Sequence, residues 1–319
     1  MRKEILSLSL LFVLLIFTSC TTSGGKDIQQ IIDELEEQEN TFDDLYSDFE
    51  IDSYSDFDFY LSKTEVISSQ EELERLQTDL ISLQELSVTQ RQLVESLQAS
   101  KPTEETAEYL NIYTKTLDLY DLSFQNYTLG LENSEIALGY SSLDAEYDDL
   151  VEQVNTQWDD FAYYSDLDQY ENASIQVDAI LVDLERQLAI LDEQDQLILF
   201  SFNNDFRQYV LLLQEYFLAA DAEFDKKGVT EAKIYAAIND YIDKLNLFVF
   251  PTDAEIDEEF DLWIKDNLYN PLHAGDEFAQ DANREWEDAE EYLEKDIDEE
   301  LTFGRRVFQE KRLSQKRVF

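Results

Sequence analysis

Apolar residues recur at alternating steps of three and four over positions 110–131, with no interruption. This spacing keeps one apolar side chain per turn on the same face of a helix, as at the a and d positions of a coiled coil. The stretch therefore predicts a long helix that buries this face against neighbouring helices. The positions are Leu110, Tyr113, Leu117, Tyr120, Phe124, Tyr127 and Leu131.

The same spacing recurs, less regularly, along most of the chain. It is found at Leu73, Leu76, Leu80 and Leu83, at Val177, Leu181, Leu184, Leu188 and Leu191, and from Phe202 to Ala220. The sequence has only seven glycines and three prolines, so it offers few of the tight turns that join β-strands. We therefore expect an all-α fold: an elongated helical bundle with antiparallel, coiled-coil-like long helices, followed by a smaller helical region.

Helix ends are marked by changes of register and by capping residues. The apolar face changes near Asn133, so either one helix of about 60 residues changes its buried face there, or two helices meet. Residues 198–204 predict a kink, and Lys226-Lys227-Gly228 has the cations and the glycine of a helix C-terminus. Thr252-Asp253-Ala254-Glu255 fits a capping box, and Asn270-Pro271 is expected to end the helix that this box begins.

The N-terminus has the layout of an export signal. Arg2 and Lys3 precede an apolar run over residues 5–17, which is shorter than the roughly 20 residues that a membrane-spanning helix needs. The next residues, Phe17-Thr18-Ser19-Cys20, resemble the lipobox of prokaryotic lipoproteins, a family that usually has leucine where this chain has Phe17. The resemblance covers only about the first 20 residues. It implies that Cys20 is lipidated and becomes the mature N-terminus.

Lipidation of Cys20 would anchor the exported chain to the outer face of a membrane, because two or more acyl chains hold stably where one is marginal. By the same resemblance, Thr21 after the cysteine favours the outer membrane in a cell that has two. The alternative is an ordinary secretory signal followed by an incidental cysteine. Cys20 is the only cysteine in the chain, so it has no disulfide partner there.

Composition divides the rest of the chain after a signal peptide over residues 1–19. Residues 20–62 are expected to be an acidic, partly disordered tether and spacer, in which residues 27–40 are compatible with an acidic helix. The motif YSDF occurs within it at residues 46–49 and 54–57, and the other interpretation is an aromatic-acidic docking segment that folds on a partner. The further predicted parts are a long-helix bundle over 63–228, shorter helices over 229–304 and a basic tail over 305–319.

Charge is distributed unevenly along the chain. The whole sequence carries −50, whereas residues 305–319 carry +5 and residues 1–19 carry +1, which leaves −56 for residues 20–304. Such an acidic body argues against nucleic-acid binding, which needs a basic face. The basic tail has four interpretations. It folds back on the acidic body, it contacts the body of another molecule, it lies on an anionic surface, or it is simply a solvated chain end. Its cations are Arg305, Arg306, Lys311, Arg312, Lys316 and Arg317.

Candidate catalytic and metal-binding residues are scarce, and no cofactor or metal site is predicted. His273 is the only histidine, which excludes zinc and di-iron motifs that need two. Its neighbours, Asn270-Pro271 and Gly275, predict a surface loop before a last helix over about 276–304. With 73 Asp and Glu residues, some carboxylate pairs lie close by chance, so a hydrolase signature has little specificity.

The leading functional hypothesis is non-enzymatic. We expect a lipid-anchored cell-envelope protein whose helical bundle acts as a structural or interaction scaffold with an acidic surface. Its partners would be the membrane, through the lipid, and another protein or a second copy, through the acidic body and the basic tail. The first alternative is an extracytoplasmic binding protein for a cationic ligand, either metal ions or a basic peptide. A weaker alternative is a carboxylate-based hydrolase.

Overall fold

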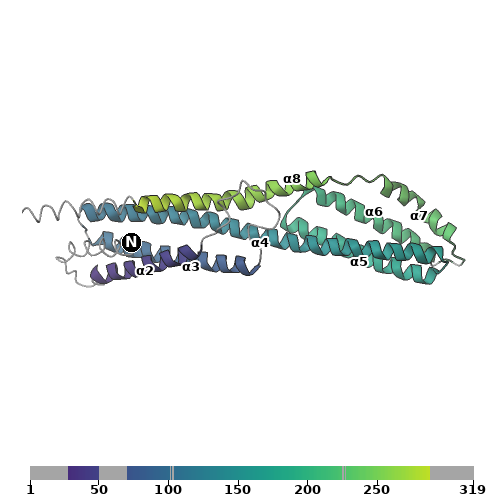
Figure 1. Cartoon of the computed structure of the whole chain (residues 1–319), viewed down its shortest axis with the longest axis horizontal. Helices are drawn as coiled ribbons and strands as arrows, with labels where there is room; N and C mark the ends of the chain where they lie inside the picture. Colours follow the sequence, from purple (N-terminus) through teal and green to yellow (C-terminus); the bar gives the residue numbers. More distant parts are fainter. Residues whose placement is uncertain are drawn as a thin grey trace, which may run out of the picture. The chain divides into compact units, whose positions relative to one another are not determined.

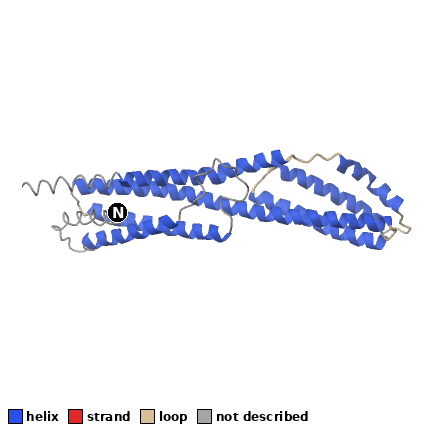
Figure 2. Cartoon of the chain, in the orientation of Figure 1, coloured by secondary structure: helices blue, strands red, loops and turns tan. Residues whose placement is uncertain are grey.

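The structure is a computed structural model that describes residues 28–49 and 70–287, except residues 101, 103, 225 and 227. Helices make up almost all of this part of the chain, which contains no β-strand (Figure 1, Figure 2). The helices pack against one another, so the expectation of an all-α bundle is confirmed.

The described helices follow one another in chain order. Their bounds are α2 (Ile28–Asp48), α3 (Gln70–Ala99), α4 (Glu104–Asp166), α5 (Tyr170–Leu197), α6 (Ser201–Phe224), α7 (Glu231–Asn246), α8 (Asp253–Ile264) and the π-helical turn η1 (Lys265–Tyr269). A further helical stretch covers residues 270–287. The chain divides into two compact units, of residues 1–131 with 267–319 and of residues 132–266, and α4 passes from the first into the second. The predicted boundary between residues 228 and 229 falls inside the second of these units.

In the first unit, the predicted coiled-coil face of α4 forms the centre of the core. All seven of its apolar positions are buried, as are the four leucines of α3 at positions 73–83. Part of this face packs in one cluster with Ile32 and Leu35 of α2 and with Leu97 of α3. From the helix over residues 270–287, the ring of Trp286 meets Tyr113 edge-on, with ring centroids 5.0 Å apart. The core therefore joins segments from distant parts of the sequence.

Helix α2 extends further into the acidic N-terminal segment than the composition suggests. Residues 41–48 continue the acidic helix expected over residues 27–40. Phe42 and Phe49 are buried, because their rings lie 4.9 Å from Tyr120 and 5.2 Å from Tyr127 of α4, measured between centroids. Burial of aromatic rings in this geometry stabilises the helix despite its charge. The second YSDF motif lies outside the described residues.

Helix α4 is a single helix of 63 residues. Of the two interpretations of the register change near Asn133, continuation with a new buried face is confirmed. Leu131, Ser134 and Tyr140 are buried on either side of the change. The helix keeps its hydrogen-bond ladder while the set of neighbours that covers it changes.

In the second unit, the C-terminal part of α4 packs with α5, α6 and α7 around one apolar cluster. The connections before α5 and before α7 contain Asp168 with φ 56° and Gly228 with φ 74°, both in the left-handed region typical of helix C-termini. The predicted kink is a three-residue break between α5 and α6. After it, Glu259 of α8 accepts hydrogen bonds from the backbone N–H (2.9 Å) and the hydroxyl of Ser201, and so caps the start of α6.

The predicted helix stop at Asn270-Pro271 is wrong. The predicted capping box of Thr252 and Glu255 is present at the start of α8, but the chain then continues through η1 into residues 270–287 without a break. A proline inside an α-helix lacks the N–H and clashes with the carbonyl four residues before it. The wider π-helical turn directly before Pro271 is the kind of distortion that accommodates this clash.

Candidate interaction surfaces

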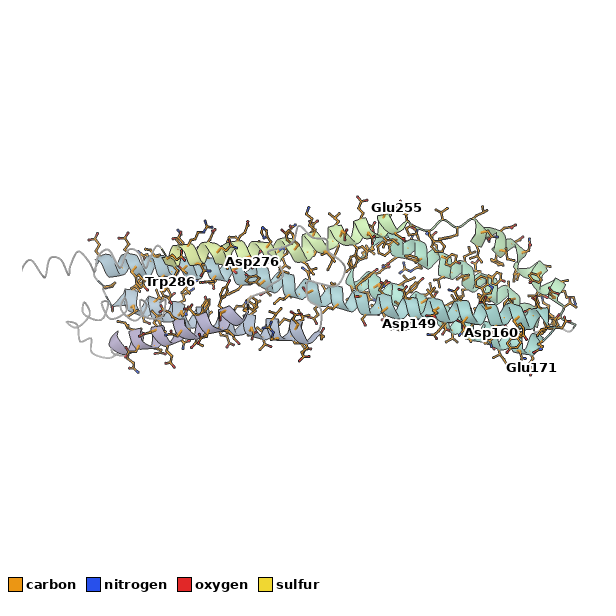
Figure 3. All side chains as sticks on the ribbon, in the orientation of Figure 1. Asp149, Asp160, Glu171, Glu255, Asp276 and Trp286 are labelled. Atoms are coloured by element: carbon orange, nitrogen blue, oxygen red, sulfur yellow. The ribbon has the colours of Figure 1, made fainter. Side chains whose placement is uncertain are left out.

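Three tyrosines on the buried face of α4 bring their hydroxyl groups to polar side chains of other helices in the first unit. One partner is a glutamate of α2, and the other two partners lie on residues 270–287, where Figure 3 labels Asp276 and Trp286. The two hydrogen bonds to residues 270–287 measure 2.9 and 2.5 Å. We call these pairs the tyrosine seam: Tyr113 with Glu39, Tyr120 with Asn283, and Tyr127 with Asp276.

Burial controls the acid–base properties of the tyrosine seam. Desolvation, followed by the charge of Glu39, raises the pKa of Tyr113 well above its ordinary value. Desolvation also raises the pKa of Tyr127 and that of Asp276. The hydrogen bond from Tyr127 and the nearby His273 act in the opposite direction on Asp276. The tyrosines therefore remain protonated at neutral pH, and Tyr120 and Tyr127 donate hydrogen bonds to Asn283 and Asp276.

The tyrosine seam does not have the layout of a carboxylate-based active site. Glu39 and Asp276 pair with Tyr113 and Tyr127, which are 14 positions apart on α4 and so about 21 Å apart along its axis. Catalytic carboxylate pairs of glycosidases lie about 5–9.5 Å apart. The seam is better explained as a set of contacts that fix how the helices meet.

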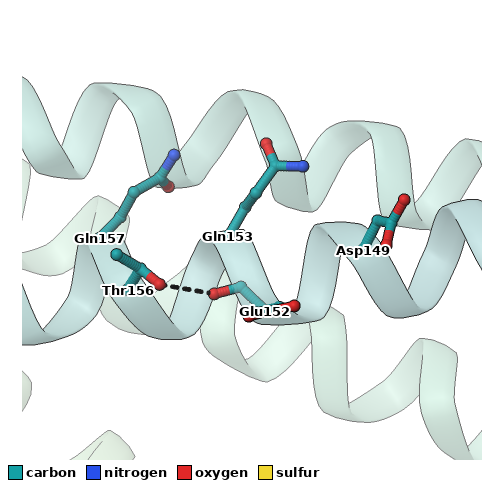
Figure 4. A pocket seen from close by; sticks show the side chains of 5 residues that line it. All are labelled: Asp149, Glu152, Gln153, Thr156 and Gln157. Carbon is teal, nitrogen blue, oxygen red and sulfur yellow. Dashed lines mark hydrogen bonds between the residues drawn. The ribbon is translucent and has the colours of Figure 1, made fainter.

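A shallow hollow of about 360 Å³ lies on the surface of the second unit. Figure 4 shows that its lining side chains come from successive turns of α4. The amide of Gln157, at one end, donates a hydrogen bond to Asp183 of α5 at 2.9 Å, and the other lining residues are exposed. Because one helix face supplies the lining, polar groups do not converge on an enclosed ligand. The lining residues are Asp149, Glu152, Gln153, Thr156 and Gln157.

His273 lies in a helix rather than in the predicted loop. Its side chain is exposed, as expected, and its ring stacks on Tyr269 with centroids 5.4 Å apart. The imidazole Nε2 is 3.6 Å from a carboxylate oxygen of Glu277. Over residues 28–49 and 70–287, no group of three or more histidine, cysteine, aspartate or glutamate side chains is arranged to hold a metal ion.

Arginine side chains bridge neighbouring helices at the surface. Arg91 of α3 contacts Asp118 and Asp121 of α4, both at 2.7 Å, and Arg186 and Arg207 also contact two carboxylates each. Exposed ion pairs of this kind stabilise a fold by about 0–1 kcal/mol each. Acidic residues far outnumber these cations, so both units present acidic surfaces.

The connection between α7 and α8 exposes apolar side chains, and the sequence analysis missed it. We call residues 247–251 the apolar connection. Leu247, Val249 and Phe250 are 79%, 83% and 44% exposed. The signal in the sequence is a run of four apolar residues directly before Pro251, in a chain where apolar residues otherwise recur at helical spacing.

The residues predicted to carry function lie outside the described part of the chain. They are the lipidation site Cys20 and the tail cations Arg305, Arg306, Lys311, Arg312, Lys316 and Arg317. No protein-family model, curated protein or solved structure matches the chain. Among the described helices, none combines the length and the apolar character needed to cross a membrane.

Proposed function

We propose that the chain is a lipid-anchored cell-envelope protein whose helical bundle acts as a structural or interaction scaffold with an acidic surface. The observation that carries the scaffold role is that the two faces of α4 differ in burial and in charge. Its apolar face is buried among other helices, while carboxylates such as Asp149, Glu152 and Asp160 remain exposed. The support for the lipid anchor is the lipobox-like Phe17-Thr18-Ser19-Cys20.

The anchor is tested by Cys20→Ser. We expect the wild-type protein in the membrane fraction and the variant in the soluble fraction, because the variant has no thiol to acylate. A matched control combines Cys20→Ser with Ser23→Cys, which keeps a cysteine but moves it, and we expect release again. Retention of both variants at the membrane would contradict the lipid anchor.

The scaffold role is tested by neutralising exposed carboxylates on one helix at a time. The first variant carries Asp149→Asn, Glu152→Gln and Asp160→Asn on α4. The matched variant carries three Glu→Gln changes on α3, at positions 71, 74 and 85, which are also exposed. Cross-linking in intact envelopes, followed by mass spectrometry, identifies the partners of each.

If a partner binds the acidic surface, one variant loses its cross-links more than the other, and added salt weakens the wild-type contact because it screens exposed charges. Unchanged cross-links in both variants would contradict an acidic scaffold. Saturable binding of a metal ion or basic peptide at high salt would instead favour the binding-protein alternative.

A further inference from the structure

The apolar connection has the features of an unpaired strand edge. Residues 248–251 belong to no helix, and the connection between α7 and α8 that contains them is drawn as an extended loop (Figure 1, Figure 2). The backbone N–H groups of Val249 and Phe250 donate no hydrogen bond to any residue that the structure describes. Free amide groups on an extended, exposed backbone are the groups through which an added peptide strand binds.

Aromatic contacts within the second unit hold this segment in place. The rings of Phe248 and Phe250 pack on Tyr209 of α6, with centroids 5.2 and 4.6 Å away, and Phe250 also lies 6.2 Å from Phe206. Neighbouring side chains on an extended backbone point in opposite directions. Anchoring the two phenylalanines therefore directs Val249 outward, in agreement with its high exposure. The segment is therefore held by its aromatic contacts on one side, and its other side is exposed.

Exposed carboxylates flank the apolar connection along the chain. Asp240 and Asp243 lie near the end of α7, and Asp253 and Glu258 lie in α8. Between residues 240 and 264 the sequence has one cation, Lys244, which lies over the ring of Tyr241. A segment that combined β-forming apolar residues with cations would match both properties of this surface.

The basic tail combines these two properties in a repeated motif. Two cations followed by valine and phenylalanine occur twice, as Arg305-Arg306-Val307-Phe308 and as Lys316-Arg317-Val318-Phe319. We propose that this repeated motif in the basic tail of one copy docks on the apolar connection of a second copy as an added β-strand. Backbone hydrogen bonds, the apolar contact with Val249 and attraction to the flanking carboxylates would act together.

Lipid attachment plays no part in this docking, so it is measured on the Cys20→Ser chain in solution. Phe308 is replaced by the photoreactive residue benzoylphenylalanine, and in a parallel sample Phe319 is replaced in the same way. After irradiation, mass spectrometry maps the cross-linked residues. We expect adducts to concentrate on residues 247–251. We expect a two-chain adduct whose yield grows with protein concentration, and adducts with the mass of one chain alone would overturn docking between copies.

Two matched variants separate docking on this segment from general attraction to the acidic body. Val249→Glu places a charge in the proposed contact, and Val182→Glu makes the same change at an exposed position of α5. Because burial of a valine side chain is lost at the first site only, we expect Val249→Glu to lower the yield of adducts at least about tenfold. Val182→Glu should leave it unchanged. Equal yields in the two variants, or adducts spread over the helix faces, would overturn the proposal.

Competition by a synthetic peptide of residues 305–319 tests the backbone contribution. The control peptide is N-methylated at Val307, Phe308, Val318 and Phe319, which removes N–H donors on both edges of a strand but keeps every charge. We expect only the unmodified peptide to suppress the adducts. Equal suppression by both would show a purely electrostatic contact and would overturn the strand pairing, without bearing on the anchor or on the scaffold.

Discussion

The two units of the molecule are both helical, but they differ in which parts of the chain their polar contacts join. In the first unit, Tyr120 and Tyr127 bond to residues 163 and 149 positions away, and Lys115 contacts Glu285 across 170 positions. In the second unit, hydrogen bonds such as that from Tyr140 to Asn203 span 63 positions, and most helices pack on their sequence neighbours.

This difference indicates that the two units reach a helical bundle through different kinds of contact. The second unit is built from consecutive helices around an apolar cluster, so local contacts can form it early in folding. The first unit must bring α2 and residues 270–287 together with α3 and α4, and the tyrosine seam supplies directional contacts that select this arrangement. We therefore expect truncation of buried apolar side chains to cause the largest loss of unfolding free energy in the second unit. Loss of a side-chain hydrogen bond should cost more unfolding free energy in the first unit than in the second.

The largest effect is expected from Phe217→Ala in the second unit. Phe217 is fully buried against Trp158, Phe161 and Tyr216. Truncating a buried phenylalanine leaves a cavity and costs about 3–5 kcal/mol of unfolding free energy. Hydrogen exchange with mass spectrometry should show lost protection over residues 132–266. Leu218→Ala, at the neighbouring exposed position, is the control. Equal loss over residues 70–131 would break the separation of the two units.

Tyr127→Phe tests the tyrosine seam. It removes the donor to the half-buried Asp276 carboxylate, and a lost hydrogen bond to a charged group costs about 1.5–3 kcal/mol. The matched change in the second unit is Tyr216→Phe, because the buried Tyr216 ring packs on its neighbours while its hydroxyl bonds to no described residue. Chemical denaturation should show a loss for the first variant and little change for the second. Equal effects would remove the proposed distinction between the two cores.

A pair of glycines on α4 sharpens the comparison with a smaller expected effect. A Cβ at Gly130 would lie 2.3 Å from the buried Leu272 side chain, whereas one at Gly139 would lie 3.3 Å from the tip of Leu197. At Gly130, but not at Gly139, the cost of overpacking exceeds the gain in helix propensity. We therefore expect Gly130→Ala to lower the free energy of unfolding by about 1–2 kcal/mol. Gly139→Ala should be neutral or stabilising. Thermal melting of both variants measures this, and a stabilised Gly130→Ala would mean that the helices are less closely packed there.

The parts of the fold that follow from local periodicity could be predicted from the sequence. The positions of α4 from Leu110 to Leu131 are buried as the alternating spacing requires. The capping box of Thr252 is also local, because its two hydrogen bonds involve residues three positions apart. Such features need no knowledge of the tertiary structure.

Features that depend on distant partners could not be predicted in this way. Phe42 lies in an acidic stretch typical of disorder, and its burial depends on Tyr120, 78 positions later. The passage of the helix through Pro271 depends on a π-helical turn that no local signal marks. The exposure of the apolar connection, a candidate interaction surface, likewise depends on which helices fail to cover it.

The smallest effect is expected from Asp276→Asn, and its sign depends on pH. Desolvation raises the pKa of Asp276 above its ordinary value of 3.8, so the folded state binds this proton more tightly than the unfolded chain does. The contribution of Asp276 to stability therefore falls as pH rises from below 3.8 through the raised pKa. Asparagine keeps the Oδ1 acceptor for Tyr127 without the charge, and so avoids this loss.

We expect Asp276→Asn to raise the midpoint of thermal unfolding at pH 7 and the gain to shrink as the pH falls below 3.8. Asp149→Asn, at an exposed position of α4, removes the same charge from the chain and controls for relief of its overall repulsion. A gain at Asp276 larger than that at Asp149 would show that desolvation governs this end of the tyrosine seam. A net loss at pH 7 would show the opposite, because the charged acceptor would then strengthen the bond from Tyr127 by more than its desolvation costs.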